Sequence, residues 1–498
     1  MHAELRYKRG LALRSLARWE EALEDWWDAL AKYEGLRDLE AVGQVSSDAA
    51  RQLLWGGRYL EALELALRGL SRLGKVVSPH RCLLLGNAGL TLSVAGYYRA
   101  GAGMIREAVR LAEELGDDQL MARALVGKAV HHFSYGQTVQ QAEAGRRAIE
   151  LCKATGDLWD LTNALWVTLA TADSLDESAA LNEELESLAA RLGNRGALFF
   201  SSRATAHRDL MLTGNISAFE EFAKQDVETC RKIGLVGLSQ SYAYCGLAHF
   251  WLGRWDEAAE ELTTAAEVEE AGVWESLDSS CLLRMKAYEG DRFGALRVLR
   301  ASPRRPPQLP LRRRLSLAKA FLRAARAAGL KSGAIWQVLS PLRERSIGRR
   351  AFRKGAVRTI GTWQMTVEAT EGLALMDMRR EAFKLYPRLE DMINSGGAVM
   401  PFHCDRLLQT AAGIAATAGG QWDKAEGHYR KAMEQARDLP HRLEQPEVRR
   451  FYAEMLLERG APGDRETARA LLSEALAIYR ELGMPKHIEM AEALLTGT

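Results

Sequence analysis

The sequence predicts an all-α solenoid built from about twelve helix-turn-helix repeats. The first observation is a short motif, LGRWDEA at 252–258, that returns as SLARWEEA at 15–22, GGRYLEA at 56–62 and AGGQWDKA at 418–425. Each copy places a tight turn and an aromatic residue before a helical pattern. The Asp or Glu that usually follows suits the positive N-terminal end of a helix. Each copy therefore predicts the turn inside a helical hairpin and the start of its second helix.

The second observation is regular spacing. The position that opens each second helix returns about every forty residues along the whole chain. These positions are Ala22, Ala62, Gly101, Gln141, Ser178, Phe219, Ala258, Ala295, Ala334, Ala382, Ala425 and Ala468. A single hairpin cannot bury its apolar face alone, so repeats of this length predict hairpins that stack on their neighbours.

Glycine and proline mark where repeats end and where the array divides. The segments at 110–118, 150–158 and 187–195 each close a helical pattern with Gly followed by Asp or Asn, which predicts a left-handed helix end. The segment SPRRPPQLP at 302–310 holds four of the twelve prolines, and proline cannot continue a helix. We therefore expect about eight repeats in 1–299, a Pro/Arg-rich linker in 300–310 and about four repeats in 311–498.

Composition predicts a folded cytoplasmic protein. Hydrophobic residues make up 47% and charged residues 27% of the 498 residues, and no apolar run reaches the ~18 residues that a membrane helix needs. The first ten residues, MHAELRYKRG, lack the apolar core of a signal peptide. The six cysteines include no CxxC pair, which favours reduced thiols. We expect no membrane association.

The residue pattern of three repeats resembles the tetratricopeptide repeat (TPR), whose pattern is W-x2-L-G-x2-Y, then A-x3-F, then A. In the first, seventh and eleventh repeats the matching residues are Gly10, Ala22, Trp26 and Ala29; Gly246, Ala258 and Ala265, with Leu262 in place of the aromatic residue; and Gly413, Ala425, Tyr429 and Ala432. The resemblance implies a right-handed superhelix. Most repeats here are longer than the 34 residues of the family.

The last repeat, at 468–495, resembles the C-terminal TPR region of bacterial adenylate or guanylate cyclase–AAA ATPase signalling proteins. That resemblance implies a regulatory scaffold that binds a protein or peptide, and it makes a cyclase or ATPase domain a candidate partner. The alternative function is that of a detached sensor half of such an enzyme system, with turnover elsewhere. The enzymatic parts of those proteins have no counterpart in this sequence.

No catalytic or metal-binding pattern stands out. The P-loop GxxxxGK[ST], HExxH, GxSxG and the EF-hand loop are all missing. SLAK at 316–319 and KSG at 331–333 lie in adjacent helical repeats, where they cannot form a serine acyl-enzyme site. His131–His132 and His403–Cys404 lack further ligands at metal spacing. We therefore expect no enzymatic activity, no cofactor and no metal.

Charge is distributed very unevenly. Between Arg300 and Arg358 lie 17 Lys or Arg residues and a single acid, Glu344, so this segment carries +16 and leaves −14 for the rest of a chain whose net charge is +2. Such a field attracts anions. The candidates for binding an anionic partner are Arg304, Arg305, Arg312, Arg313, Arg314, Arg349, Arg350, Arg353 and Lys354.

Three explanations of this segment stay open. It docks an acidic protein or a missing domain, it binds nucleic acid, or it forms a solvated face that complements the chain's own acidic repeats near 256–275. Few aromatic residues lie among the basic ones (Phe321, Trp336 and Phe352) and no nucleic-acid-reading motif occurs, so nucleic acid is the least expected partner.

A TPR-like groove would be lined by the first helix of each repeat. Counting back from the repeat positions places Arg123, Asp160, Asn163 and Arg208 at groove positions of the fourth to sixth repeats. They are polar on helices that are otherwise rich in Ala and Leu. We predict that they contact a bound peptide, although exposed helix residues are also polar for solubility alone.

Overall fold

The computed structural model describes residues 2–301 and 360–496, except 17, 95–96, 135–136, 170, 235–236, 269–275 and 401–405. These residues form helices joined by short turns. The described part of the chain contains no strand, and one isolated β-bridge joins Val399 to Leu407. The predicted all-α solenoid is confirmed.

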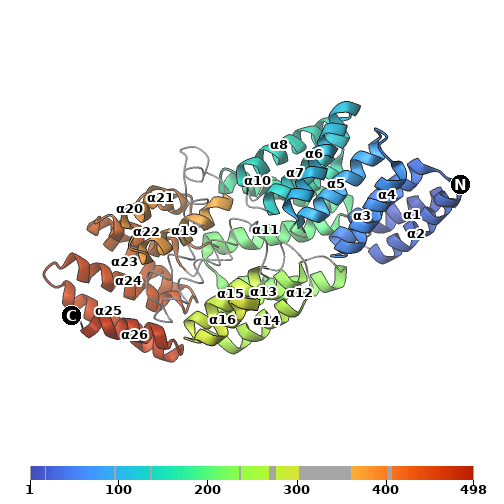
Figure 1. Ribbon diagram of the computed structural model, residues 1–498. Coiled ribbons are helices and arrows are strands. Elements are labelled where there is room, and N and C mark those ends of the chain that lie inside the picture. The colour runs from blue at the N-terminus through green and yellow to red at the C-terminus, as the bar shows by residue number, and fades with distance from the viewer. Residues whose placement is uncertain are drawn as a thin grey trace. The chain divides into compact units, whose positions relative to one another are not determined.

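The helices run in consecutive pairs, and Figure 1 shows the two members of a pair lying side by side. The first helices of the pairs up to residue 301 are α1 (His2–Ser15), α3 (Leu39–Trp55), α5 (Pro79–Val94), α7 (Asp118–Ser134), α9 (Leu158–Leu169), α11 (Arg195–Thr213), α13 (Leu238–Trp251) and α15 (Ser276–Tyr288). The second helices are α2 (Trp19–Leu36), α4 (Tyr59–Leu73), α6 (Tyr98–Leu115), α8 (Thr138–Thr155), α10 (Leu175–Leu192), α12 (Ile216–Ile233), α14 (Trp255–Glu267) and α16 (Arg292–Ala301).

The C-terminal repeats follow the same plan with one irregular pair. Their helices are α19 (Ile360–Leu375), α20 (Arg379–Phe383), α21 (Tyr386–Asn394), α22 (Leu408–Ala418), α23 (Trp422–Asp438), α24 (Glu444–Arg459), α25 (Asp464–Glu481) and α26 (Pro485–Thr496). The second helix of the α19 repeat is divided into α20 and α21, and Pro387 stands in the first turn of α21. Proline fits there because the first helical N–H groups have no partner within the helix.

The chain forms two compact units. Unit 1 contains Met1–Thr205 and Val227–Leu238, and unit 2 contains Ala206–Asp226, Ser239–Val268 and Ser276–Thr498. Within unit 1, the first helices α3, α5, α7 and α9 each pack on their own second helix, and they also pack on one another in turn. This is the nearest-neighbour stacking that the repeat spacing predicts.

The predicted repeat positions mark the same place in every described hairpin except the last, where Thr467, one residue before the predicted Ala468, donates the corresponding bond to Gly463. From Ala22 to Ala425, the backbone N–H of each described position donates to the carbonyl oxygen four residues earlier, which is the first bond of the second helix. Most of these residues are buried; Ser178 is half-buried. Gln141 is buried although it is polar, and its Nε2 donates to the Val167 carbonyl oxygen at 2.6 Å.

The glycine and the aromatic residue of a repeat pack against each other. A Cβ added to Gly413 would lie 2.6 Å from Tyr429 Cε1, and one added to Gly246 would lie 2.6 Å from Leu262 Cγ. Gly10 is in the same position against the indole ring of Trp26, which is fully buried. The TPR-like pattern therefore has its expected cause, since a large side chain of the second helix fills the space that glycine leaves on the first.

Two helical glycines provide a matched test of this packing. Gly413→Ala is expected to lower the free energy of unfolding by about 1–3 kcal/mol, because Tyr429 must move away from the new methyl group. Gly427→Ala meets no atom within 4 Å and is expected to raise it by about 0.5–1 kcal/mol through helix propensity. Urea titration of both variants measures the difference, and effects of the same sign would contradict the packing argument.

The predicted helix ends are confirmed. Gly116, Gly156 and Gly193 follow α6, α8 and α10 with φ values of 63°, 73° and 63°, in the left-handed region. The predicted linker at 300–310 lies almost wholly outside the described residues. The division into 1–299 and 311–498 therefore stays a prediction.

Within unit 2, the C-terminal repeats also contact helices that precede them far along the chain. The Ala398 N–H donates to the Met211 carbonyl oxygen at 2.7 Å, and the Arg442 N–H donates to the Trp251 carbonyl oxygen at 3.0 Å. Tyr288 stacks on His487 of α26 with ring centroids 4.7 Å apart. Unit 2 is therefore more than a linear array in which each repeat contacts its neighbours alone.

Candidate ligand-binding pocket

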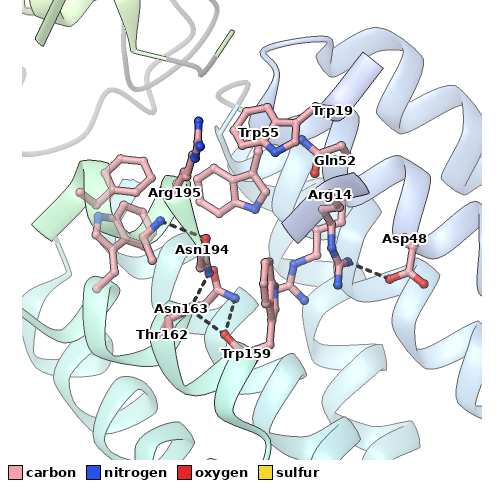
Figure 2. A pocket seen from close by; sticks show the side chains of 15 residues that line it. Arg14, Trp19, Asp48, Gln52, Trp55, Trp159, Thr162, Asn163, Asn194 and Arg195 are labelled. Atoms are coloured by element: carbon pink, nitrogen blue, oxygen red, sulfur yellow. Dashed lines mark hydrogen bonds and ion pairs between the residues drawn. The ribbon is translucent and has the colours of Figure 1, made fainter. Parts of the chain in front are cut away.

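A pocket lies inside unit 1, where first helices of early and late repeats come together. One wall is a stripe of α3 and the other a stripe of α9, each with the spacing i, i+3, i+4, i+7 that places four residues on one helix face. The α3 stripe is Asp48, Arg51, Gln52 and Trp55, and the α9 stripe is Trp159, Thr162, Asn163 and Trp166. Arg14 of α1, Trp19 of α2 and Phe200 of α11 also line it (Figure 2). The space between these side chains, counted together with the open solvent at its mouth, is about 660 Å³.

Aromatic rings form much of the pocket wall. Trp55 lies edge-to-face against Trp166, with centroids 5.6 Å apart and an interplanar angle of 82°. Phe200 contacts both rings, at 5.8 Å from Trp55 and 4.6 Å from Trp166. Trp19, Trp55, Trp159 and Trp166 are all half-buried, so part of each ring faces the hollow. Such a wall suits a flat apolar group.

Arg14 is half-buried and has few partners for its guanidinium. Its Nη1 reaches Asp48 Oδ1 at 3.5 Å, while Asp48 Oδ2 accepts a hydrogen bond from the Tyr7 hydroxyl at 2.7 Å. The Arg14 guanidinium lies over the Trp159 ring, 4.6 Å from its centroid. Burial lowers the pKa of Arg14 and Asp48 opposes this shift, but an arginine stays protonated in proteins. Arg14 therefore carries a positive charge that is only weakly compensated.

Asp160 joins the two walls of the pocket beneath its surface. Arg51 Nη2 lies 2.8 Å from Asp160 Oδ1, and Arg123 Nε donates to Asp160 Oδ2. Asn163 Nδ2 donates to Asp160 Oδ1 at 3.2 Å. Asp160 is fully buried. Burial alone would raise the pKa of Asp160, but Arg51 and Arg123 outweigh it and hold the pKa below its ordinary value.

The structure brings three of the four predicted groove residues together. Arg123 and Asn163 both donate to Asp160, and Asn163 lines the pocket. Asp160 has no exposed surface from which to contact a ligand, so its place in the structure is that of a counter-ion between helices. Arg208 lies in unit 2 and reaches Asp209 Oδ1 at 3.7 Å. A direct role of these residues in peptide binding stays a prediction.

The aromatic wall of the pocket is not predicted by the repeat pattern. Trp55, Trp159 and Trp166 follow no repeat-wide pattern, so the repeat motif does not indicate them. The sequence does contain a signal. The α9 segment repeats a tryptophan after seven residues with polar Thr162 and Asn163 between, and the α3 segment has three polar residues before Trp55 at the same spacing. Two first helices with one mixed aromatic and polar face indicate a shared surface.

A second group of buried charges lies in unit 2. Arg406 is 1% exposed and contacts three carboxylates, with Nε 3.3 Å from Glu371 Oε2, Nη1 3.3 Å from Glu444 Oε2, and Nη2 donating to Glu447. Arg450 adds two hydrogen bonds to Glu447, at 3.0 and 3.1 Å. Glu447 thus receives more positive charge than Glu444.

The acids in this group differ in pKa for that reason. Burial raises the pKa of Glu444 to about 7, although Arg406 and the Leu407 N–H oppose the shift. Glu447 is equally buried, but Arg450 and Arg406 hold its pKa well below the ordinary value. These side chains are buried within unit 2 and are already paired with one another, so we interpret the group as a structural element.

The chain matches no protein-family model and no curated protein. Among solved structures, it is similar to yeast Tom70. The match covers 99% of this chain and 96% of that chain, with 12% sequence identity and a TM-score of 0.24. Similarity at this level carries no argument about function, so the fold assignment depends on the repeats described above.

Three further predictions concern the basic segment, metal binding and membrane helices. The anionic-partner candidates from Arg304 to Lys354 lie outside the described residues. Within the part of the chain that the structure describes, no group of three or more His, Cys, Asp or Glu side chains is placed to hold a metal ion. In the same part, no helix has the length and apolar character to cross a membrane.

Proposed function

We propose that the chain is a non-catalytic interaction module that captures a peptide or protein segment on the inner surface of unit 1. The observation that supports this proposal is the hollow between α3 and α9, which the protein's own side chains leave unfilled. Half-buried tryptophans surround it, and tryptophan is a common anchor residue of protein interfaces. The buried Asp160 contacts hold the two helices in place before any ligand arrives, which limits the ordering that binding requires.

A peptide selection with a matched pair of variants tests this proposal. We expect random peptides displayed on phage to be enriched on the immobilised full chain, and their affinity to fall about tenfold in Trp19→Ala. Trp422→Ala is the control, because Trp422 opens α23 as Trp19 opens α2 but does not line the pocket. Peptides that bind wild type and Trp19→Ala equally would contradict capture at this pocket.

We further propose that the basic segment at 300–358 docks an acidic protein, for which a cyclase or ATPase domain of the same signalling system is the candidate. The net charge of +16 supports this proposal, because such a field speeds association with anions and depends on salt. The arginines at 304, 305, 312, 313, 314, 349, 350 and 353 and Lys354 are the residues that would contribute.

Binding of a polyglutamate peptide across a salt series tests this second site. We expect its affinity to fall steeply between about 50 and 500 mM NaCl, because the Debye length shrinks over this range. Replacing Arg304, Arg305, Arg349 and Arg350 by Gln should weaken binding at low salt and flatten the salt dependence. An unchanged series would contradict the docking role. Salt-sensitive retardation of arbitrary duplex DNA would favour nucleic acid as the partner instead.

A further inference from the structure

Gln52 presents a buried donor that has no acceptor. It lies in the α3 wall of the pocket, is 6% exposed, and its Nε2 has no hydrogen-bond partner among the described residues. Buried polar groups are nearly always paired, because an unpaired one loses its bonds to water without replacement. The amide of Gln52 therefore marks a place where an acceptor from outside the chain would bind.

Arg14 presents a second unused donor at the same pocket. Its Nε is buried and, within the described ranges, has no hydrogen-bond partner, while Nη1 makes the long 3.5 Å contact with Asp48. Figure 2 shows Arg14 and Gln52 at the same pocket, next to Trp55 and Trp19. A guanidinium edge with a free Nε–H is the geometry that a carboxylate accepts with two parallel bonds.

The charge of the lining also selects an anion. The charged residues that line the pocket are Arg14, Arg51, Arg195 and Asp48, which leaves a formal excess of two positive charges. Arg51 is already paired with Asp160 and Arg195 is exposed, so Arg14 is the half-buried cation with capacity for a further partner. A cationic ligand would meet repulsion here, whereas one carboxylate would satisfy both Arg14 and Gln52.

The aromatic wall selects the rest of the ligand. Trp55, Trp166 and Phe200 already contact one another edge-to-face or tilted, and a further ring can extend the cluster in the same geometries. The Arg14 side chain is held over Trp159, so its position relative to the rings is fixed. A ligand with a flat apolar group next to an anion would therefore fit the pocket, with the flat group against the aromatic rings and the anion against Arg14.

From these features we infer that the pocket binds an aromatic ring that carries a carboxylate, with Arg14 and Gln52 as the carboxylate donors. The ring lies among Trp55, Trp166 and Phe200. The aromatic acid can have two sources: a free small molecule, or the C-terminal aromatic residue of a captured segment. Only the second source rests on the proposed function. Both present the same chemistry to the pocket.

Calorimetry on the full chain with small probes tests the chemistry. We expect 3-phenylpropionate to bind about tenfold more tightly than 3-phenylpropionamide, which lacks the charge, and than 3-cyclohexylpropionate, which lacks the aromatic ring. Gln52→Leu should lower the affinity for 3-phenylpropionate about tenfold, since a hydrogen bond to a charged group is lost. Gln119→Leu, an exposed position on α7, is the control and should have no effect.

The same variant has a second readout that a folding defect cannot imitate. Gln52→Leu removes an unpaired buried amide, so its melting temperature without ligand should equal or exceed that of wild type. Equal binding of the acid, its amide and its cyclohexyl analogue would overturn the inference. So would unchanged binding in Gln52→Leu, or tighter binding of a neutral disaccharide such as maltose.

Peptide probes separate this inference from the proposed function. The peptide acetyl-Gly-Gly-Phe with a free C-terminus should bind, and its C-terminal amide should bind about tenfold less tightly. If the free acid binds and peptides do not, capture of a segment fails and the pocket is a small-molecule site. If selected peptides bind without needing a ring or a carboxylate, segment capture stands and the aromatic-acid inference fails.

Discussion

Asp160→Ala is expected to lower the free energy of unfolding of unit 1 by about 3–5 kcal/mol, because Arg51 and Arg123 would lose their shared counter-ion in a buried place. The backbone of α9 would be unaffected, so the loss reports on the charges themselves. Urea titration followed by circular dichroism measures it. Asp173→Ala is the matched control, since its partner Arg146 and Asp173 itself are exposed, and it should cost less than about 1 kcal/mol.

The pH dependence of this effect follows from the sign of the shift. The pKa of Asp160 is depressed in the folded chain, so its contribution to stability is present above the ordinary Asp pKa and is lost as pH falls through the folded value. The difference between wild type and Asp160→Asn should therefore be full at neutral pH and shrink in strong acid. A small difference at neutral pH, or one equal to that of Asp173→Ala, would contradict the assigned role.

The Asp160 contacts also connect stability to binding. Arg51 belongs to α3 and Asp160 to α9, so their ion pair fixes the spacing of the two pocket walls. Loss of Asp160 should weaken binding of 3-phenylpropionate even at temperatures where the variant is folded. The proposed ligand contacts themselves, Arg14 and Gln52, are unchanged in this variant. Asp160 is thus a positioning residue in our account.

The repeat positions could be predicted from the sequence because their causes are local. Ala22, Ala258 and Ala425 are small since two helices cross there, and Gly413 and Tyr429 complement each other within one hairpin. These contacts join residues close in sequence, so the same local requirement leaves the same residue types in each repeat. The left-handed glycines at helix ends, such as Gly156, are equally local.

The pocket could not be predicted in this way. It depends on the sum of the small rotations between successive repeats of unit 1, and this sum decides which distant helices meet. Arg51 and Asp160 lie far apart in sequence, and no repeat motif states that α3 and α9 will meet. Asp160 and Asn163 are visible in the sequence as polar residues on an apolar helix, but such residues can face either a ligand or a helix far away in the sequence. The structure places Arg51, which is far away in the sequence, next to Asp160 in space. Sequence spacing alone does not reveal this contact.

Arg406→Met is expected to have a comparable effect on unit 2, with a loss of about 3–5 kcal/mol at pH 8. Arg406 is the shared partner of Glu371, Glu444 and Glu447, and these acids would be left buried with less positive charge. Arg406→Lys should not rescue the variant, because a single ammonium cannot contact three carboxylates as the planar guanidinium does. Arg437→Met, at an exposed position of α23, is the control and should cost less than about 1 kcal/mol.

The loss in Arg406→Met should be smaller at pH 5 than at pH 8. The pKa of Glu444 is already raised to about 7 beside Arg406, and removal of that cation can only raise it further. A raised acid pKa favours the folded chain below the ordinary Glu pKa, and this advantage is lost as pH rises through the folded value. At pH 5 Glu444 is therefore protonated and needs no counter-ion. A loss independent of pH would contradict this role of Glu444 and would attribute the stabilisation to packing and to Glu447, whose depressed pKa keeps it ionised at both pH values.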